Sequence, residues 1–139
     1  PFMRTIRGSL VVLLFYSLVI FVFVSLDFAQ GNNSGFVLPP DPGKAGKETL
    51  LGIDTDGDGV RDDIQRYIYL TYPDDKKLRL GLTYYAKEFQ GVLKDADDRE
   101  AAYDHAIKMD RHGECLYYLK GRESIDICRA LRAEILNTR

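Results

Sequence analysis

The sequence predicts an all-α protein, a small bundle of about four helices whose first helix follows directly from an acidic loop. Two observations support this fold class. Beyond residue 60, apolar residues recur three and four positions apart, which is the spacing of one face of an α-helix. No stretch alternates apolar and polar residues in the way that a half-buried β-strand does. With 139 residues, the chain is long enough for one folded domain.

An uncharged and strongly apolar stretch occupies residues 8–26 and follows Arg4 and Arg7. A positive end followed by an apolar run is typical of a segment that directs export. Small residues before Asn32 would allow cleavage there, so residues 1–31 are a signal peptide or, since the run can just span a bilayer, a retained signal anchor. In both cases Arg4 and Arg7 favour an orientation in which the N-terminal end of this segment lies on the cytoplasmic side of the membrane. The rest of the chain is therefore expected outside the cytoplasm, whether periplasmic, secreted or membrane-anchored.

Residues 32–49 are rich in Gly, Asn, Ser and Pro, and they predict a linker between the export segment and the helical domain. The domain itself is then expected to span residues 50–139. Leu50, Leu51 and Ile53 are its first apolar residues. We expect them to pack on the helices just before the acidic loop.

Five aspartates and two glycines crowd into residues 54–63, where the carboxylates would repel one another unless a cation lay among them. Short calcium loops place oxygen ligands at positions 1, 3, 5, 7 and 9, and a glycine in the sharp turn at position 6. Counting from Asp54 reproduces this pattern, with Gly59 in the turn. The predicted ligands are Asp54, Asp56, Asp58, the Val60 carbonyl and Asp62. The alternative is an acidic turn with an aspartate helix cap, but a cap needs only one aspartate.

This loop resembles the calcium loops of EF-hand-like families. Gln65 stands at position 12, where a paired EF-hand has a bidentate Glu, and Arg61 stands at position 8, where it has an apolar residue. Prolines and glycines in residues 39–52 argue against an entering helix. The loop is therefore more similar to the single loops of thrombospondin type 3 repeats, dockerins and excalibur-type bacterial domains, the last of which carry an acid at position 10, as Asp63 does here. The resemblance implies calcium and an extracytoplasmic setting but no activity, and it leaves open whether Asp63, Gln65 or a water molecule completes the ion's shell.

Four helices are expected after the loop. The first carries Ile64, Tyr67 and Ile68 and ends before Pro73, because the residue before a proline avoids α geometry. The second begins near Asp74. Its apolar face is Leu78, Leu82, Tyr85, Ala86, Phe89 and Leu93, and it contains Gly81 and Gly91, which lower helix propensity.

The third helix is expected to begin at Asp97, because Glu100 three residues later forms a capping-box pattern. Gly121 would close this helix, and Ser124 would cap the fourth. The inner face of the third helix would be Ala102, Ala106, Met109, Gly113 and Leu116. That of the fourth would be Ile127, Cys128, Leu131 and Ile135.

The two cysteines, Cys115 and Cys128, lie at equal offsets from the turn predicted at Gly121 and Arg122. Equal offsets would place them opposite each other in an antiparallel helix pair, and an exported protein occupies a compartment where disulfides persist. We therefore predict a Cys115–Cys128 disulfide, with two buried free thiols as the alternative. No cysteine pair or histidine spacing supports a zinc site.

Composition and motifs narrow the classes of function. The net charge is −2 and no basic stripe is present, which argues against nucleic acid as a partner. No nucleophile motif or phosphate-binding loop is recognisable, and the seven-residue separation of His105 and His112 argues against a second metal site. These features favour a non-enzymatic protein; an enzyme with an unrecognised site is the less favoured alternative.

The sequence therefore predicts an exported calcium-binding helical protein with a structural Ca²⁺ site. Its expected partners are the calcium ion and, where the N-terminal segment stays uncleaved, the membrane. A second hypothesis is an envelope protein–protein interaction module that calcium organises, with a partner that the sequence does not identify. It is favoured by the abundance of tyrosine, because tyrosine is enriched at interaction surfaces. The tyrosines of the helical body are Tyr67, Tyr69, Tyr72, Tyr84, Tyr85, Tyr103, Tyr117 and Tyr118.

Overall fold

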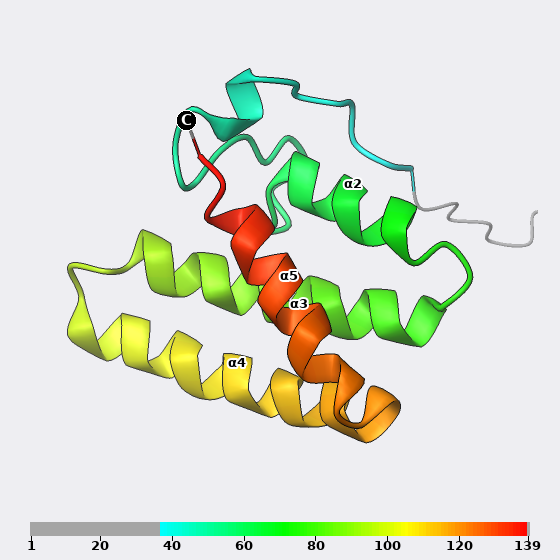
Figure 1. Ribbon diagram of the computed structural model, residues 1–139. Helices are drawn as coiled ribbons and strands as arrows, with labels where there is room; N and C mark the ends of the chain where they lie inside the picture. The colour runs from blue at the N-terminus through cyan, green and yellow to red at the C-terminus, as the bar shows by residue number, and fades with distance from the viewer. Residues whose placement is uncertain (1–36, 139) are drawn as a thin grey trace, which may run out of the picture. The chain divides into compact units, whose positions relative to one another are not determined.

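The computed structural model describes residues 37–138, which form helices joined by loops and contain no strand (Figure 1). The prediction of a small all-α fold is confirmed for this part of the chain. The helices are α2 (Asp62–Thr71), α3 (Lys76–Lys94), α4 (Arg99–Lys120) and α5 (Glu123–Ile135), and a short 3₁₀ helix, η1 (Ala45–Lys47), precedes them. All of them belong to one compact unit that begins at Leu38.

The predicted export or anchor segment, residues 1–31, lies outside the described residues. Among residues 37–138, no helix combines the length and the apolar composition needed to cross a bilayer. The assignment of residues 1–31 therefore stays an expectation from the sequence.

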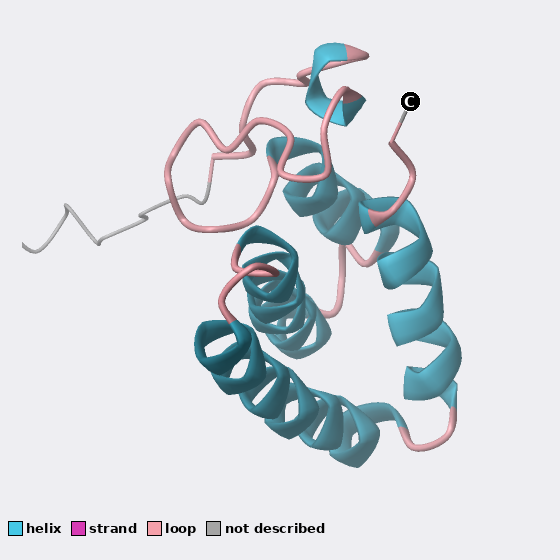
Figure 2. Cartoon of the chain, turned by 90° about the vertical axis from the view of Figure 1, so that its left-hand side faces the viewer, coloured by secondary structure: helices cyan, strands magenta, loops and turns pink. Residues whose placement is uncertain are grey.

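Helices α3 and α5 each contact the other three helices, and α3 packs most extensively, above all on α4. α3 and α4 run antiparallel and side by side, and α5 crosses α3 on its way back toward the start of α2 (Figure 1). The long irregular segment before α2 lies beside the start of α2 and the end of α5, as the loops in Figure 2 show. The acidic loop therefore sits where elements from both ends of the unit meet.

The core is built largely from the apolar faces that the helical periodicity predicts. Val60, which is part of the acidic loop, is fully buried in this core and anchors the loop to it. On α4 the predicted inner face is correct only in part, since Leu116 is its one buried residue. The other core side chains are Ile64, Ile68, Leu78, Leu82, Tyr85, Ala86, Ile127, Cys128, Leu131 and Ile135.

Gly81 and Gly91 allow α4 to approach α3 closely, a role that their low helix propensity did not predict. A Cβ atom at Gly81 would lie 2.8 Å from Leu116 Cδ2, and one at Gly91 would lie 2.5 Å from His105 Nδ1. Both distances are far below a normal carbon contact. The two glycines therefore contribute to helix packing, and their cost in helix propensity is offset by it.

Replacing Gly81 by alanine is expected to lower the free energy of unfolding by about 1 kcal/mol, because the new methyl group would press on fully buried Leu116. Gly113→Ala on α4 is the matched control. A Cβ there would lie 3.8 Å from Tyr85, an ordinary contact, so this variant should gain about 0.5–1 kcal/mol from helix propensity. Urea unfolding of both variants measures the difference, and equal stabilisation by both would contradict the packing role.

The predicted helix caps are shifted by one or two residues. α3 is capped by Asp75, whose carboxylate accepts the Leu78 N–H at 2.9 Å. α4 is capped by Asp98, one residue after Asp97. Ser124 lies inside α5, and its hydroxyl donates to the Gly121 carbonyl at 2.7 Å. On α3 and α4 a neighbouring aspartate takes the capping position, whereas the N-cap of α5 is Arg122, whose side chain makes no capping hydrogen bond.

Leu50, Leu51 and Ile53 are exposed, so the prediction that they pack on the helices was wrong. The segment is held by polar contacts instead. The Arg66 guanidinium donates to the Pro39 carbonyl at 2.9 Å, and Asp62 N–H donates to the Ile53 carbonyl at 2.8 Å. The side chains of Lys47 and Glu134 form an ion pair at 2.5 Å. These contacts join residues 38–53 to α2 and α5.

The predicted Cys115–Cys128 disulfide is not formed, and both thiols are free. Cys128 is buried, whereas Cys115 is exposed on α4. Neighbouring Leu116 occupies the inward position, and successive residues point about 100° apart around a helix. The equal offsets from the turn predicted that the two cysteines lie at the same height along the two helices. They did not account for the direction in which Cys115 points around α4.

Candidate metal centre

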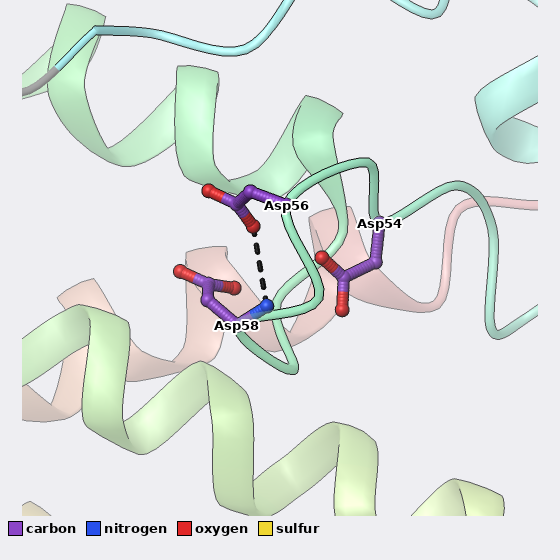
Figure 3. Close-up of side chains that lie close together, drawn as sticks. All are labelled: Asp54, Asp56 and Asp58. Carbon is purple, nitrogen blue, oxygen red and sulfur yellow. Dashed lines mark hydrogen bonds between the residues drawn. The ribbon is translucent and has the colours of Figure 1, made fainter.

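The carboxylates of Asp54, Asp56 and Asp58 converge in the loop, with ligand oxygens that all lie within 4.8 Å of one another. In Figure 3, Asp56 and Asp58 lie side by side and the Asp54 carboxylate faces them across the loop. Gly57 and Gly59 make this turn, since both adopt positive φ, 71° and 89°, which side chains disfavour. Positions 1, 3 and 5 of the predicted calcium pattern are thus together in space.

Backbone N–H groups shape the loop by donating to these same carboxylates. Asp54 accepts from Gly57 N–H and Gly59 N–H, each at 2.9 Å. Asp56 accepts from Asp58 N–H at 3.2 Å, and Asp58 accepts from Val60 N–H at 2.7 Å. These backbone N–H bonds hold the three carboxylates close together in the loop.

The electrostatics of Asp58 reflect this crowding. Burial is the main reason that the pKa of its carboxyl lies above the ordinary value. The hydrogen bond from Val60 N–H opposes the shift, while the charges of Asp56 and Asp54 add to it. Three acids at this separation favour a cation among them, because a cation removes both the repulsion and the penalty of burying Asp58.

Two of the predicted ligands are engaged elsewhere. Asp62, which is nearly fully buried, accepts from the Thr55 backbone N–H at 2.9 Å and from its hydroxyl at 2.5 Å. Asp63 forms a two-point ion pair with Arg61, at 2.9 and 2.6 Å. The structure therefore does not bring Asp62 and Asp63 to the cluster. Their contacts with Thr55 and Arg61 stabilise the loop from outside it.

Gln65, at position 12, does reach the cluster. Its side-chain amide donates from Nε2 to Asp58 Oδ2 at 2.8 Å. The residue is only 1% exposed, and its Oε1 atom is buried without a hydrogen-bond partner among residues 37–138. Buried amide oxygens are nearly always satisfied, so an orphaned one beside three carboxylates needs an explanation. A half-turn of the amide plane exchanges Nε2 and Oε1 and would present an oxygen ligand to a cation in the loop.

Arg61 is the residue of this region whose role the sequence did not reveal. Its side chain is fully buried, and its Nη1 donates to the Ile135 carbonyl at 2.9 Å and the Leu50 carbonyl at 3.3 Å. Its backbone N–H donates to Gln90 Oε1 at 3.0 Å. Arg61 thus joins the loop to α3, to α5 and to the segment before the loop. The only sequence signal was a basic residue among five acids.

A second cation, Lys87 of α3, holds the loop from the other side. Its ammonium group donates to the Asp58 backbone carbonyl at 2.7 Å. Its aliphatic stem lies against Gly59, where a Cβ atom would be 3.2 Å from Lys87 Cε. Within residues 37–138 Lys87 forms no ion pair with the three carboxylates, although its charge lowers the pKa of Asp58 and so opposes the effect of burial.

No family model, curated protein or solved structure matches this chain. The likeness to known calcium loops therefore covers only the short acidic segment, and the interpretation of the site depends on its own geometry. That geometry offers hard oxygen ligands and no sulfur or imidazole nitrogen, a set that suits Ca²⁺ or Mg²⁺ better than Zn²⁺.

Proposed function

We propose that this is an exported, non-enzymatic calcium-binding protein in which Ca²⁺ binds Asp54, Asp56 and Asp58 and stabilises the helical domain. The observation that carries the proposal is the pairing of three converging carboxylates with the buried, unpartnered Oε1 of Gln65. Acidic clusters are common on protein surfaces, but a buried amide oxygen without a partner beside one is not.

The ion's role follows from what the loop connects. Bound Ca²⁺ would offset the repulsion among the three acids and lock the turn at Gly57 and Gly59. Arg61 and Lys87 link the loop backbone to α3 and α5. Stabilising the loop therefore stabilises a junction between distant parts of the chain, which is a structural role for the metal.

The exported setting fits the expected strength of binding. Single extracellular calcium sites bind at about 10⁻⁴–10⁻³ M, which is useful only where calcium is abundant. The uncharged run at residues 8–26 and the preceding arginines are the sequence features that support export.

The test is thermal unfolding of the protein, followed by circular dichroism, with Ca²⁺, with Mg²⁺ and with a chelator. We expect Ca²⁺ at ten times its dissociation constant to add about 1.4 kcal/mol of stability, with a smaller effect from Mg²⁺ because Mg²⁺ demands a near-ideal octahedral site. An Asp54→Asn, Asp56→Asn double variant is the control, and it should melt at the same temperature in all three conditions. Superimposed curves for the unaltered protein would reject the proposal.

A calcium-organised interaction module is the second candidate, and one observation favours it. Leu50, Leu51 and Ile53 are exposed immediately before the loop. Arg61, which borders the metal centre, donates to the Leu50 carbonyl, so calcium would order the backbone that presents these side chains. A partner that binds only the calcium form, and not a Leu51→Ser variant of unchanged stability, would support this candidate over a purely structural site.

A further inference from the structure

A cavity of about 480 Å³ adjoins the metal centre. One wall is the loop, including Asp54, and the other is the C-terminal half of α3, from which Lys87, Gln90 and Lys94 line the cavity. Positions three and seven residues apart lie on one face of a helix, so these three side chains form a row about 10 Å long. None of the three is part of the core apolar cluster.

This row offers hydrogen-bond donors that the described residues leave unused. Gln90 is 5% exposed, and its Oε1 is committed to the Arg61 N–H. Its Nε2 donates to no described residue, although Gln90 lines the cavity. Lys94 forms no ion pair within residues 37–138, and Lys87 donates only to the uncharged carbonyl of Asp58. The wall thus presents one amide N–H₂ group, on a side chain that is 5% exposed, between two ammonium groups.

The acids near the cavity are already engaged. Asp95 Oδ2 lies 3.3 Å from His105 Nε2, and Glu88 Oε2 lies 2.6 Å from His105 Nδ1, so one imidazole joins both carboxylates. Asp54 accepts two backbone N–H groups and belongs to the metal centre. Asp54 and Asp95 both line the cavity and would oppose a negative ligand; a cation bound in the loop would offset the charge of Asp54, and the Asp95 carboxylate lies beside the His105 imidazole.

We propose that this cavity binds a small oxyanion, a carboxylate or phosphate group that is free or at the end of a larger molecule, between Lys87, Gln90 and Lys94. The donor row has the chemistry for it, because ammonium and amide N–H groups both donate to anionic oxygen. The expected strengthening of binding by calcium rests on the proposed function, since the ion would neutralise Asp54. Coupling of this kind is reciprocal, so the oxyanion would also tighten calcium binding.

Isothermal titration calorimetry of the full chain tests the proposal with two probes, acetate and methyl phosphate, each with calcium and with chelator. The stronger probe identifies a carboxylate or a phosphate site. Lys94→Met should weaken its binding roughly ten- to a hundredfold, the loss of one charged hydrogen bond. Gln90→Glu should weaken it at least as much while keeping an acceptor for Arg61. Lys77→Met, a lysine of α3 away from the cavity, is the matched control and should leave binding unchanged.

The outcomes separate this proposal from the metal site. If neither probe binds in the presence or absence of calcium, or if Lys77→Met weakens binding as much as Lys94→Met, the oxyanion site is rejected. Calcium binding measured without either probe judges the metal centre independently, because Lys94 lies outside the carboxylate cluster. Oxyanion binding that Lys94→Met weakens, without any calcium effect, would support the oxyanion site and reject only its coupling to calcium.

Discussion

Replacing Arg61 by methionine is expected to lower the free energy of unfolding by about 3–5 kcal/mol. Methionine keeps most of the apolar volume but leaves Asp63, which is mostly buried, without its ion-pair partner. It also leaves the Ile135 and Leu50 carbonyls without the Nη1 donor. Breaking one partner of a buried pair is costly because an uncompensated charge remains inside the protein. Urea unfolding with a chelator present measures this effect without any contribution from metal.

Two further variants make the Arg61 experiment decisive. Arg129→Met removes an arginine whose pair with Asp126 is exposed, so stability should change by no more than about 0.5 kcal/mol. Arg61→Met combined with Asp63→Asn removes the stranded charge and should recover part of the loss. A cost for Arg61→Met no larger than for Arg129→Met would mean that Arg61 does not join the loop to α5.

The helices were largely predictable because their signals are local. The spacing of Leu78, Leu82 and Ala86 follows from helix geometry alone, and Gly121 ends α4 with a φ of 59°, as expected of a closing glycine. The interior of α4 was less predictable, since a helix that packs mainly on one neighbour buries few residues. The packing of α4 on α3 depends on contacts between residues far apart in the sequence. Gly81 and Gly91 of α3 make room for Leu116 and His105 of α4, and local helix propensity does not predict such contacts.

The candidate site likewise has one part that the local sequence predicts and another that depends on contacts between distant residues. Asp54, Asp56 and Asp58 come together because two glycines and short-range N–H bonds shape the loop, and residue spacing alone could indicate this. The use of Asp62 by Thr55, and of Asp63 by Arg61, depends on side-chain choices among several acids of equal chemistry. Arg61 was missed for a related reason. Its partners Leu50, Gln90 and Ile135 are distant in sequence, and burial of an arginine is rare unless it is paired.

The second large effect concerns calcium affinity, and it depends on Gln65. In the structure its amide reaches Asp58 through nitrogen, while its oxygen has no partner. A cation in the loop would favour the reversed amide, which offers one neutral oxygen. Paired EF-hands place a bidentate glutamate at this position, and ligand charge is a principal determinant of calcium affinity.

Gln65→Glu is therefore expected to tighten Ca²⁺ binding by about ten- to a hundredfold. Without metal the new carboxylate would be buried beside Asp58, whose pKa burial already raises, so the metal-free variant should unfold at a lower temperature than the unaltered protein. With saturating calcium the order should reverse, because the added charge then faces the ion. Gln65→Leu is the control of similar size, and it should bind calcium more weakly than the unaltered protein. Calcium titrations that give one affinity for all three side chains would show that residue 65 points away from the ion, and the orphaned amide oxygen would then lose its connection to metal binding.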